Sequence, residues 1–195
     1  MSIYSIILLA AGSSGRMGRP KQLLPYKDNT LLQHLLDQAK GSKANNIIVV
    51  LGAFEQEVKS SMNADGIHIV VNDEWQEGLA SSIRWGINEL QKISPSTDAA
   101  ILMMCDQPFV SSELLDELIN KHEKTGKPIV TCSFDYTTGP PALFHQSLFP
   151  ELLQLTGDRG AKKVVEIHVG NTVTIPFSMG NIDVDTMDDY EALKK

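Results

Sequence analysis

A chain of 195 residues with 42% hydrophobic residues and a formal net charge of −7 has the size and composition of one compact domain. The acidic charge disfavours a nucleic-acid partner, because binding to nucleic acid calls for a basic surface. The sequence lacks an apolar stretch of membrane-spanning length and a signal-peptide pattern. We therefore expect a single domain over residues 1–195 in a cytoplasmic protein with no membrane partner.

The predicted elements alternate between apolar, β-branched runs and stretches of helical periodicity. Strands are expected over residues 3–10, 47–51, 67–71, 99–105, 129–134, 142–144 and 172–176. Helices are expected over residues 31–39, 55–62, 81–90 and 148–155, with a short closing helix from Thr186. A further helix after residue 105 is expected to carry Leu114, Leu115, Leu118 and Ile119 on one side. The strands 129–134 and 142–144 are expected to flank a turn at Gly139-Pro140-Pro141. Such alternation predicts an α/β fold, a three-layer α/β/α arrangement with a mostly parallel, Rossmann-like sheet.

The two cysteines are too few for a disulfide framework. Cys105 and Cys132 both lie in apolar, strand-like runs. We expect buried free thiols in a reducing compartment, which agrees with a cytoplasmic protein.

The segment that follows the first expected strand, residues 9–21, is rich in glycine and in positive charge. Its glycines and cations are Gly12, Gly15, Gly18, Arg16, Arg19 and Lys21. Glycines let the backbone approach a ligand closely, and the exposed amides of such a loop can bind phosphate oxygens. Three cations in an otherwise acidic protein point the same way, so the segment is predicted to bind phosphate.

The spacing within this loop differs from two common glycine motifs. The loop of many NTPases has Lys and then Ser or Thr directly after its last glycine, whereas Gly18 is followed by Arg-Pro-Lys. The dinucleotide fingerprint has its first two glycines two residues apart and opens a helix, which Pro20 and Pro25 oppose here. A dinucleotide-dependent oxidoreductase is therefore disfavoured.

Acidic residues follow two of the expected strands. Asp106 comes directly after an apolar strand, which places it at the edge of the sheet where ligands bind. Asp183 and Asp185 lie two apart in an extended segment and would project to the same face. Mg²⁺ prefers hard oxygen ligands, with one or two carboxylates completed by water and substrate phosphates. We expect Asp106 and Asp183 to hold Mg²⁺, with Asp185 as the alternative to Asp183.

The glycine loop resembles the signature of the nucleotidyltransferases related to molybdopterin guanylyltransferase and molybdenum cofactor cytidylyltransferase. Further blocks similar to the family's follow in the family's order: Asn72 with Gly78-Leu79-Ala80-Ser81-Ser82-Ile83, Cys105-Asp106-Gln107-Pro108, Gly139-Pro140-Pro141, Gly157-Asp158-Arg159-Gly160-Ala161 and Asp183-Val184-Asp185-Thr186. The chain departs from the family's pattern at Pro140 and Met187. The resemblance covers almost the whole chain and implies a nucleotide-diphospho-sugar transferase-like fold.

The resemblance, taken with the chemistry of the residues, implies a role for each position. Catalysis is expected from Arg16, Lys21 and Asp106. Nucleotide binding is expected from Leu9, Ala10, Ala11, Gly12, Arg16, Lys21, Asn72, Gly78 and Ser81. Mg²⁺ is the implied cofactor, held by Asp106 and Asp183.

The expected reaction moves a nucleoside monophosphate from a nucleoside triphosphate to molybdopterin or molybdenum cofactor and releases pyrophosphate. CTP is favoured, because GTP-using relatives carry glycine where this chain has Ala11, and because Cys105-Asp106-Gln107-Pro108 resembles the cytidylyltransferase branch. The resemblance further implies a transient contact with a molybdoenzyme or its chaperone. Two alternatives stay open: transfer to a sugar-1-phosphate or other small phosphate ester, and a catalytically inactive nucleotide-binding regulator.

Overall fold

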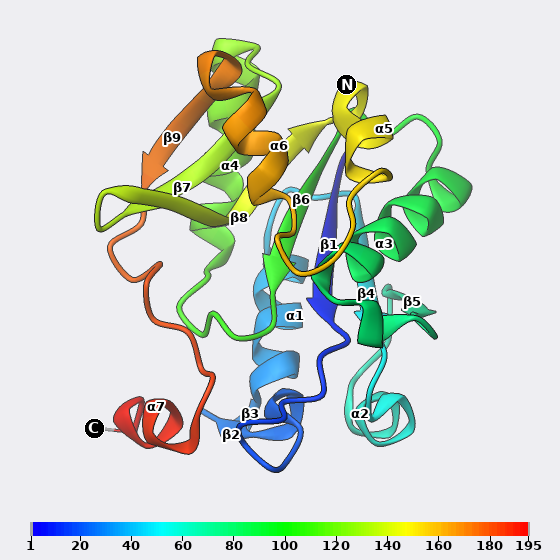
Figure 1. Cartoon of the computed structure of the whole chain (residues 1–195), viewed down its shortest axis with the longest axis vertical. Helices are drawn as coiled ribbons and strands as arrows, with labels where there is room; N and C mark the ends of the chain where they lie inside the picture. Colours follow the sequence, from blue (N-terminus) through cyan, green and yellow to red (C-terminus); the bar gives the residue numbers. More distant parts are fainter. Residues whose placement is uncertain (1, 195) are drawn as a thin grey trace.

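A computed structural model describes residues 2–194. One sheet has seven strands in the order β5-β4-β1-β6-β8-β7-β9 (Figure 1). Its strands are β1 (Tyr4–Ala10), β4 (Asn46–Leu51), β5 (His68–Val71), β6 (Ala99–Met104), β7 (Ile129–Phe134), β8 (Thr137–His145) and β9 (Thr172–Pro176). The α-helices are α1 (Leu31–Gly41), α2 (Glu55–Ser61), α3 (Leu79–Ile93), α4 (Ser112–Thr125), α5 (Phe149–Leu152), α6 (Lys162–Ile167) and α7 (Met187–Ala192).

Strand β1 is the centre of the parallel part of the sheet. It pairs in parallel with β4 on one side and with β6 on the other, and all seven of its residues are buried. A strand that is covered on both faces needs no polar alternation, which is why its sequence is an almost unbroken apolar run. Its carboxyl end therefore lies at the same edge of the sheet as the carboxyl ends of β4 and β6.

Helices cover both faces of the sheet (Figure 1). On one face, α1 and α4 pack through Leu31, Leu35 and Leu118 into a core that also holds Ile6 and Leu8 of β1. The opposite core joins Ile7 of β1 to the apolar sides of α3, α5 and α6. The predicted three-layer α/β/α fold with a mostly parallel sheet is confirmed.

The prediction of a turn at Gly139-Pro140-Pro141 is wrong. These residues lie inside β8, which runs antiparallel to both β6 and β7, and the turn of the hairpin is at Asp135 and Tyr136. The register shifts at Thr131/Cys132, so that Thr131 pairs with Ala142 while Cys132 pairs with Gly139. The two prolines, which have no amide proton to donate to the ladder, thus occupy the irregular part of the strand.

Other elements differ from the sequence-based expectation in length or were not expected. Residues 148–155 form only the short helix α5, which follows a 3₁₀ turn (Gln146–Leu148). Helix α6 and the small hairpin of β2 (Pro25–Tyr26) and β3 (Asn29–Thr30) were not predicted. Among residues 2–194, no helix combines the length and the apolar character needed to cross a membrane.

Candidate active site

The glycine loop leaves β1 at the edge of the sheet and returns to the core at Met17. Met17 is buried, and its amide donates to the Ser14 carbonyl at 2.8 Å. Gln22 braces the loop from below: its Nε2 donates to the carbonyls of Ala10 at 2.7 Å and Gly12 at 3.0 Å. Within the described chain, the amides of residues 12–16 donate no hydrogen bond. These amides are therefore available to a phosphate group.

Lys21 follows the loop, in a single 3₁₀ turn (Lys21–Leu23) between the prolines that oppose a longer helix. Its Nζ donates to Asp106 Oδ2 at 3.2 Å and to Asp185 Oδ1 at 2.8 Å. Burial by itself lowers the pKa of Lys21, but the charges of Asp106 and Asp185 outweigh this, so the pKa is raised. The side chain therefore carries its positive charge into the site.

Asp185 links the two cations of the loop. Besides Lys21, it accepts from Arg16 Nη2 at 2.7 Å, although the Arg16 side chain is largely exposed. Partial burial raises the pKa of Asp185, but the bonds to Lys21 and Arg16 outweigh this and lower it. A triphosphate that binds in the loop would compete with Asp185 for both cations.

Asp106 and Asp183 come together at the same place, although 76 residues separate them in the sequence. Asp106 follows β6, and its carbonyl accepts from the Val184 amide at 2.8 Å. The Asp183 carboxyl lies at an exposed rim, where partial desolvation raises its pKa to about 6, with further contributions from the charges of Asp106 and then Asp185. Two neighbouring carboxylates that repel each other in this way suit one divalent cation.

The donor set fits a magnesium site that is completed by its substrates. Among the described residues, no group of three or more His, Cys, Asp or Glu side chains converges on one point. Asp106 and Asp183 would supply two hard oxygen ligands, and water and phosphate oxygens would supply the others.

Two cavities meet at Asp106. The first, of about 310 Å³, is lined on one side by the glycine loop and on the other by the start of α3. It contains seven of the residues predicted to bind the nucleotide or to act in catalysis: Leu9, Ala10, Ala11, Gly12, Lys21, Gly78 and Asp106. Trp75 also lines this cavity, a role that the sequence alone did not decide.

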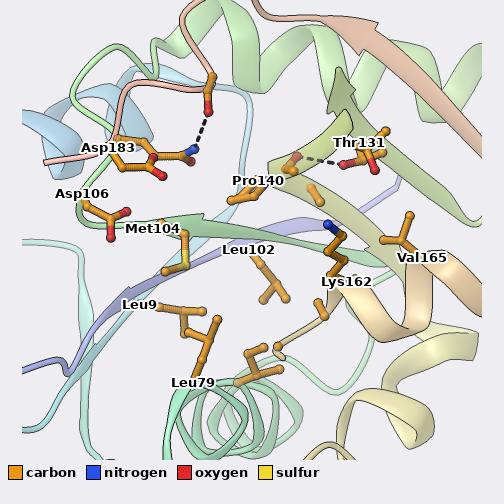
Figure 2. A pocket seen from close by; sticks show the side chains of 18 of the residues that line it. Leu9, Leu79, Leu102, Met104, Asp106, Thr131, Pro140, Lys162, Val165 and Asp183 are labelled. Atoms are coloured by element: carbon orange, nitrogen blue, oxygen red, sulfur yellow. Dashed lines mark hydrogen bonds between the residues drawn. The ribbon is translucent and has the colours of Figure 1, made fainter. Parts of the chain in front are cut away.

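The second cavity, of about 250 Å³, lies between β6, β8 and the segment that leads into α6 (Figure 2). Its walls are mainly apolar, with Leu102, Met104 and Pro140 among them, while Asp106 and Asp183 lie at one end. Lys162 extends its amine over this space (Figure 2). The two cavities share Leu9, Leu79, Met104 and Asp106.

Asn72 and Ser81 do not line either cavity, contrary to the expectation that they face a substrate. Both are fully buried. Asn72 Nδ2 donates to Ser81 Oγ at 2.8 Å, and Ser81 Oγ donates to the carbonyl of Gly78 at 2.9 Å. They hold the turn before α3, where Gly78 has a φ of 112° and has no room for a Cβ beside Asp158. Their effect on the site is exerted through this turn.

Some residues of the site were not singled out as functional from the sequence. Gln22 and Gln107 are both buried, and each lines one of the two cavities. Asp158 reaches the first cavity from a distant loop, and Thr131 reaches the second from β7. Gln107 and Asp158 stand in blocks that resemble the family, whereas no sequence pattern marks Thr131, whose place depends on the β7–β8 pairing.

Comparison with known proteins adds relatives of similar length. The sequence matches the family described as MobA-like NTP transferase domain over residues 6–173. It is 29% identical over 167 residues to nicotine blue oxidoreductase of Paenarthrobacter nicotinovorans, covering 80% of this chain and 78% of that one. The structure of Rv0371c from Mycobacterium tuberculosis is 33% identical, with a TM-score of 0.86 over 100% of this chain and 99% of that one. A manganese complex of Rv0371c has 32% identity and a TM-score of 0.82, covering 98% and 97%.

More distant structures share the fold. Molybdopterin-guanine dinucleotide biosynthesis protein A from Archaeoglobus fulgidus has 19% identity and a TM-score of 0.73, covering 97% of this chain and 96% of that one. A CMP:2-keto-3-deoxy-manno-octonic acid synthetase complexed with CTP has 14% identity and a TM-score of 0.78, covering 99% and 97%. The family match spans most of the chain and agrees with the nucleotide-diphospho-sugar transferase-like fold. The chain belongs to the MobA-like NTP transferase family of nucleotidyltransferases.

Proposed function

We propose that this protein transfers a cytidylyl group from CTP to the phosphate of a molybdopterin-type acceptor and releases pyrophosphate, with Mg²⁺ as its cofactor. The observation that carries the proposal is the meeting of two cavities at Asp106. One cavity has a glycine loop with unbonded amides and Lys21, as a triphosphate requires. The other is largely apolar and suits the body of a second substrate.

The chemistry needs alignment and charge neutralisation more than a general base. A phosphate monoester is largely dianionic near neutral pH, since its second pKa is about 6. Its oxygen would attack the α-phosphorus while the bond to the bridging oxygen breaks and pyrophosphate leaves. Lys21 and the loop amides would hold the triphosphate in line and stabilise the departing charge. Mg²⁺ held by Asp106 and Asp183 would neutralise phosphate oxygens.

The preference for CTP is supported by the packing of Ala11. Its methyl group lies against Gly52, where an added Cβ would come within 2.8 Å of Ala11 Cβ. The Ala11 carbonyl also accepts from the Ala53 amide at 3.0 Å, so the residue is held from two directions. Ala11 lines the first cavity, and a methyl group at this fixed position would leave less room for a purine than a glycine would.

A pyrophosphate-release screen tests the proposal. CTP, GTP, ATP and UTP would each be offered with molybdopterin and, separately, with a sugar-1-phosphate, in Mg²⁺ and in Mn²⁺. We expect release with CTP and molybdopterin, and loss of it in Asp106→Asn, which excludes a contaminating activity. Release with the sugar phosphate alone would favour the second acceptor class. CTP binding without turnover for any acceptor would favour a regulator.

The name of one relative suggests a further control. Nicotine blue oxidoreductase is 29% identical over most of both chains. The same preparation should therefore be tested for oxidation of NADH and NADPH. We expect none, because the glycine spacing differs from the dinucleotide fingerprint and Lys21 with Asp106 supplies a site for phosphoryl chemistry.

A further inference from the structure

Gln107 is buried in the wall of the second cavity and keeps one polar atom without a partner. It follows Asp106 directly, is 3% exposed, and lines the cavity together with Asp106 and Asp183. Its amide nitrogen donates to the Gly180 carbonyl at 3.4 Å. Within the part of the chain that the structure describes, its Oε1 is buried and accepts no hydrogen bond.

A buried carbonyl oxygen without a partner is unfavourable, and native proteins keep few of them. The walls around Gln107 are mainly apolar, and the hydroxyl of Thr131 is already committed to the Gly139 carbonyl at 2.8 Å (Figure 2). Among residues 2–194, no side chain donates a hydrogen bond to Oε1. The cavity that Gln107 lines is where a partner can come from.

We propose that Gln107 selects the acceptor substrate: its Oε1 accepts a hydrogen bond from an N–H or O–H group of the acceptor bound in the second cavity. The inference rests on the proposed function and adds to it the residue that recognises the second substrate. Because Gln107 adjoins Asp106, the donor group lies close to the phosphate that reacts. An acceptor without such a donor leaves Oε1 buried and unpaired, which is the strongest form of discrimination that a polar site can provide.

Gln22 provides a matched comparison in the first cavity. It is also buried, at 1% exposure, and its Oε1 also has no partner in the described chain. Its Nε2, however, braces the glycine loop through the carbonyls of Ala10 and Gly12. Replacing Gln22 should therefore affect the nucleotide, whereas replacing Gln107 should affect the acceptor.

The test compares Gln107→Met with Gln22→Met, because methionine keeps a similar length and has no strong hydrogen-bonding atoms. We expect Gln107→Met to raise the KM for the acceptor about tenfold and to change the KM for CTP less than about twofold. Its Tm should change little, because removal of the unsatisfied Oε1 from a buried position offsets loss of the long hydrogen bond from Nε2 to the Gly180 carbonyl. Gln22→Met should show the opposite split between the two substrates. An unchanged acceptor KM, whatever the Tm of the variant, would overturn the inference.

Binding without turnover separates this inference from the proposed function. Molybdopterin and glucose 1-phosphate, as sources of ring N–H and sugar O–H donors, would be titrated calorimetrically into wild type and Gln107→Met. Weaker binding of either probe to the variant supports the inference, even if the wild type releases no pyrophosphate. The absence of pyrophosphate release would count against the proposed function alone. Equal binding of both probes to the two proteins, including no binding to either, contradicts the inference.

Discussion

Asp106 is the residue at which the two cavities, the loop cation Lys21 and the C-terminal carboxylates meet. It belongs to both cavities and accepts from Lys21 at 3.2 Å. Its charge also contributes to the raised pKa of Asp183. Lys21 also bonds to both Asp106 and Asp185, so Asp185 lies near Asp106 as well. The difference between Asp183 and Asp185 is that Asp185 already has two cationic partners.

We predict that Asp106→Asn and Asp183→Asn each weaken Mn²⁺ binding by more than about tenfold, because a neutral amide is a poorer ligand for a hard cation. Asp185→Asn should weaken it less, since the carboxylate of Asp185 is engaged by Lys21 and Arg16. Titration of bound Mn²⁺ by electron paramagnetic resonance measures all three variants. A larger loss in Asp185→Asn than in Asp183→Asn would make Asp185 the second ligand.

The methyl group of Ala11 is predicted to set the preference among nucleotides. Ala11→Gly should reduce the preference for CTP over GTP, measured as the ratio of kcat/KM values, by about tenfold, because one methyl group in a pocket contributes roughly 1–3 kcal/mol of discrimination. Ala53→Gly is the matched control: it adds similar backbone freedom beside the loop, but Ala53 does not line the first cavity. An equal change in the two variants would attribute the effect to backbone freedom.

At the residue scale, the sequence predicts best where a motif is contiguous. Asp106 follows β6 almost directly, and Lys21 ends the loop that follows β1, so strand direction places both at one edge of the sheet. Asn72 is different, because its side chain could bond either to a ligand or to the Ser81 hydroxyl. Which partner it has depends on a turn that the sequence does not specify. The unsatisfied oxygens of Gln22 and Gln107 become visible only when burial is known.

At the scale of elements, the segment from Asp183 to α7 ties the end of the chain to the glycine loop. The chain passes from β9 through this segment to α7, which lies at the same end of the molecule as β2 and β3 (Figure 1). Thr186 and Asp189 form a capping box that starts α7, as the sequence predicts for Thr186. Tyr190, on α7, is buried, and its hydroxyl donates to the Pro25 carbonyl at 2.6 Å. The carboxylates of the site thus depend on a helix anchored beside Lys21.

Tyr190→Phe is expected to lower the free energy of unfolding by about 1 kcal/mol, because the Pro25 carbonyl loses its donor while the ring stays in place. Tyr136→Phe is the control, since Tyr136 is fully exposed at the tip of the β7–β8 hairpin and should change stability by less than about 0.5 kcal/mol. Urea denaturation measures both variants. Equal stabilities for Tyr190→Phe and wild type would show that α7 does not need this bond.

The elements that the sequence predicted less well are those whose form depends on tertiary pairing. The buried parallel strands have apolar runs that identify them without context. In β8, by contrast, Gly139-Pro140-Pro141 has the composition of a turn, yet pairing with β6 and β7 holds it in a strand that is irregular at Thr131/Cys132. The true turn at Asp135 and Tyr136 uses left-handed backbone that neither residue strongly signals.

At the scale of the whole molecule, both cysteines lie in one hydrophobic core, so the reactivity of their thiols is a probe of its unfolding. Cys105 and Cys132 belong to the same apolar cluster, on the face that α1 and α4 cover. Both thiols are free and buried, as the sequence predicted. Burial, with a smaller contribution from nearby Asp106, raises the pKa of Cys105 from 9.0 to about 12. Burial, with a contribution from Glu117, has the same effect on Cys132.

Both thiols should therefore react with an aromatic disulfide reagent only after the core opens, because the thiolate is the reactive form. We expect slow reaction in the native protein, at a rate that rises with denaturant as global unfolding does, and reaction of both thiols in full denaturant. A Cys105→Ala variant follows Cys132 alone. A rate of thiol reaction that is independent of denaturant would instead indicate a local opening at the cysteine that reacts.

The stability of the protein should also depend on pH. Because folding raises both thiol pKa values, the unfolded chain loses its thiol protons first, and the free energy of unfolding should fall as pH rises from 9.0 to about 12.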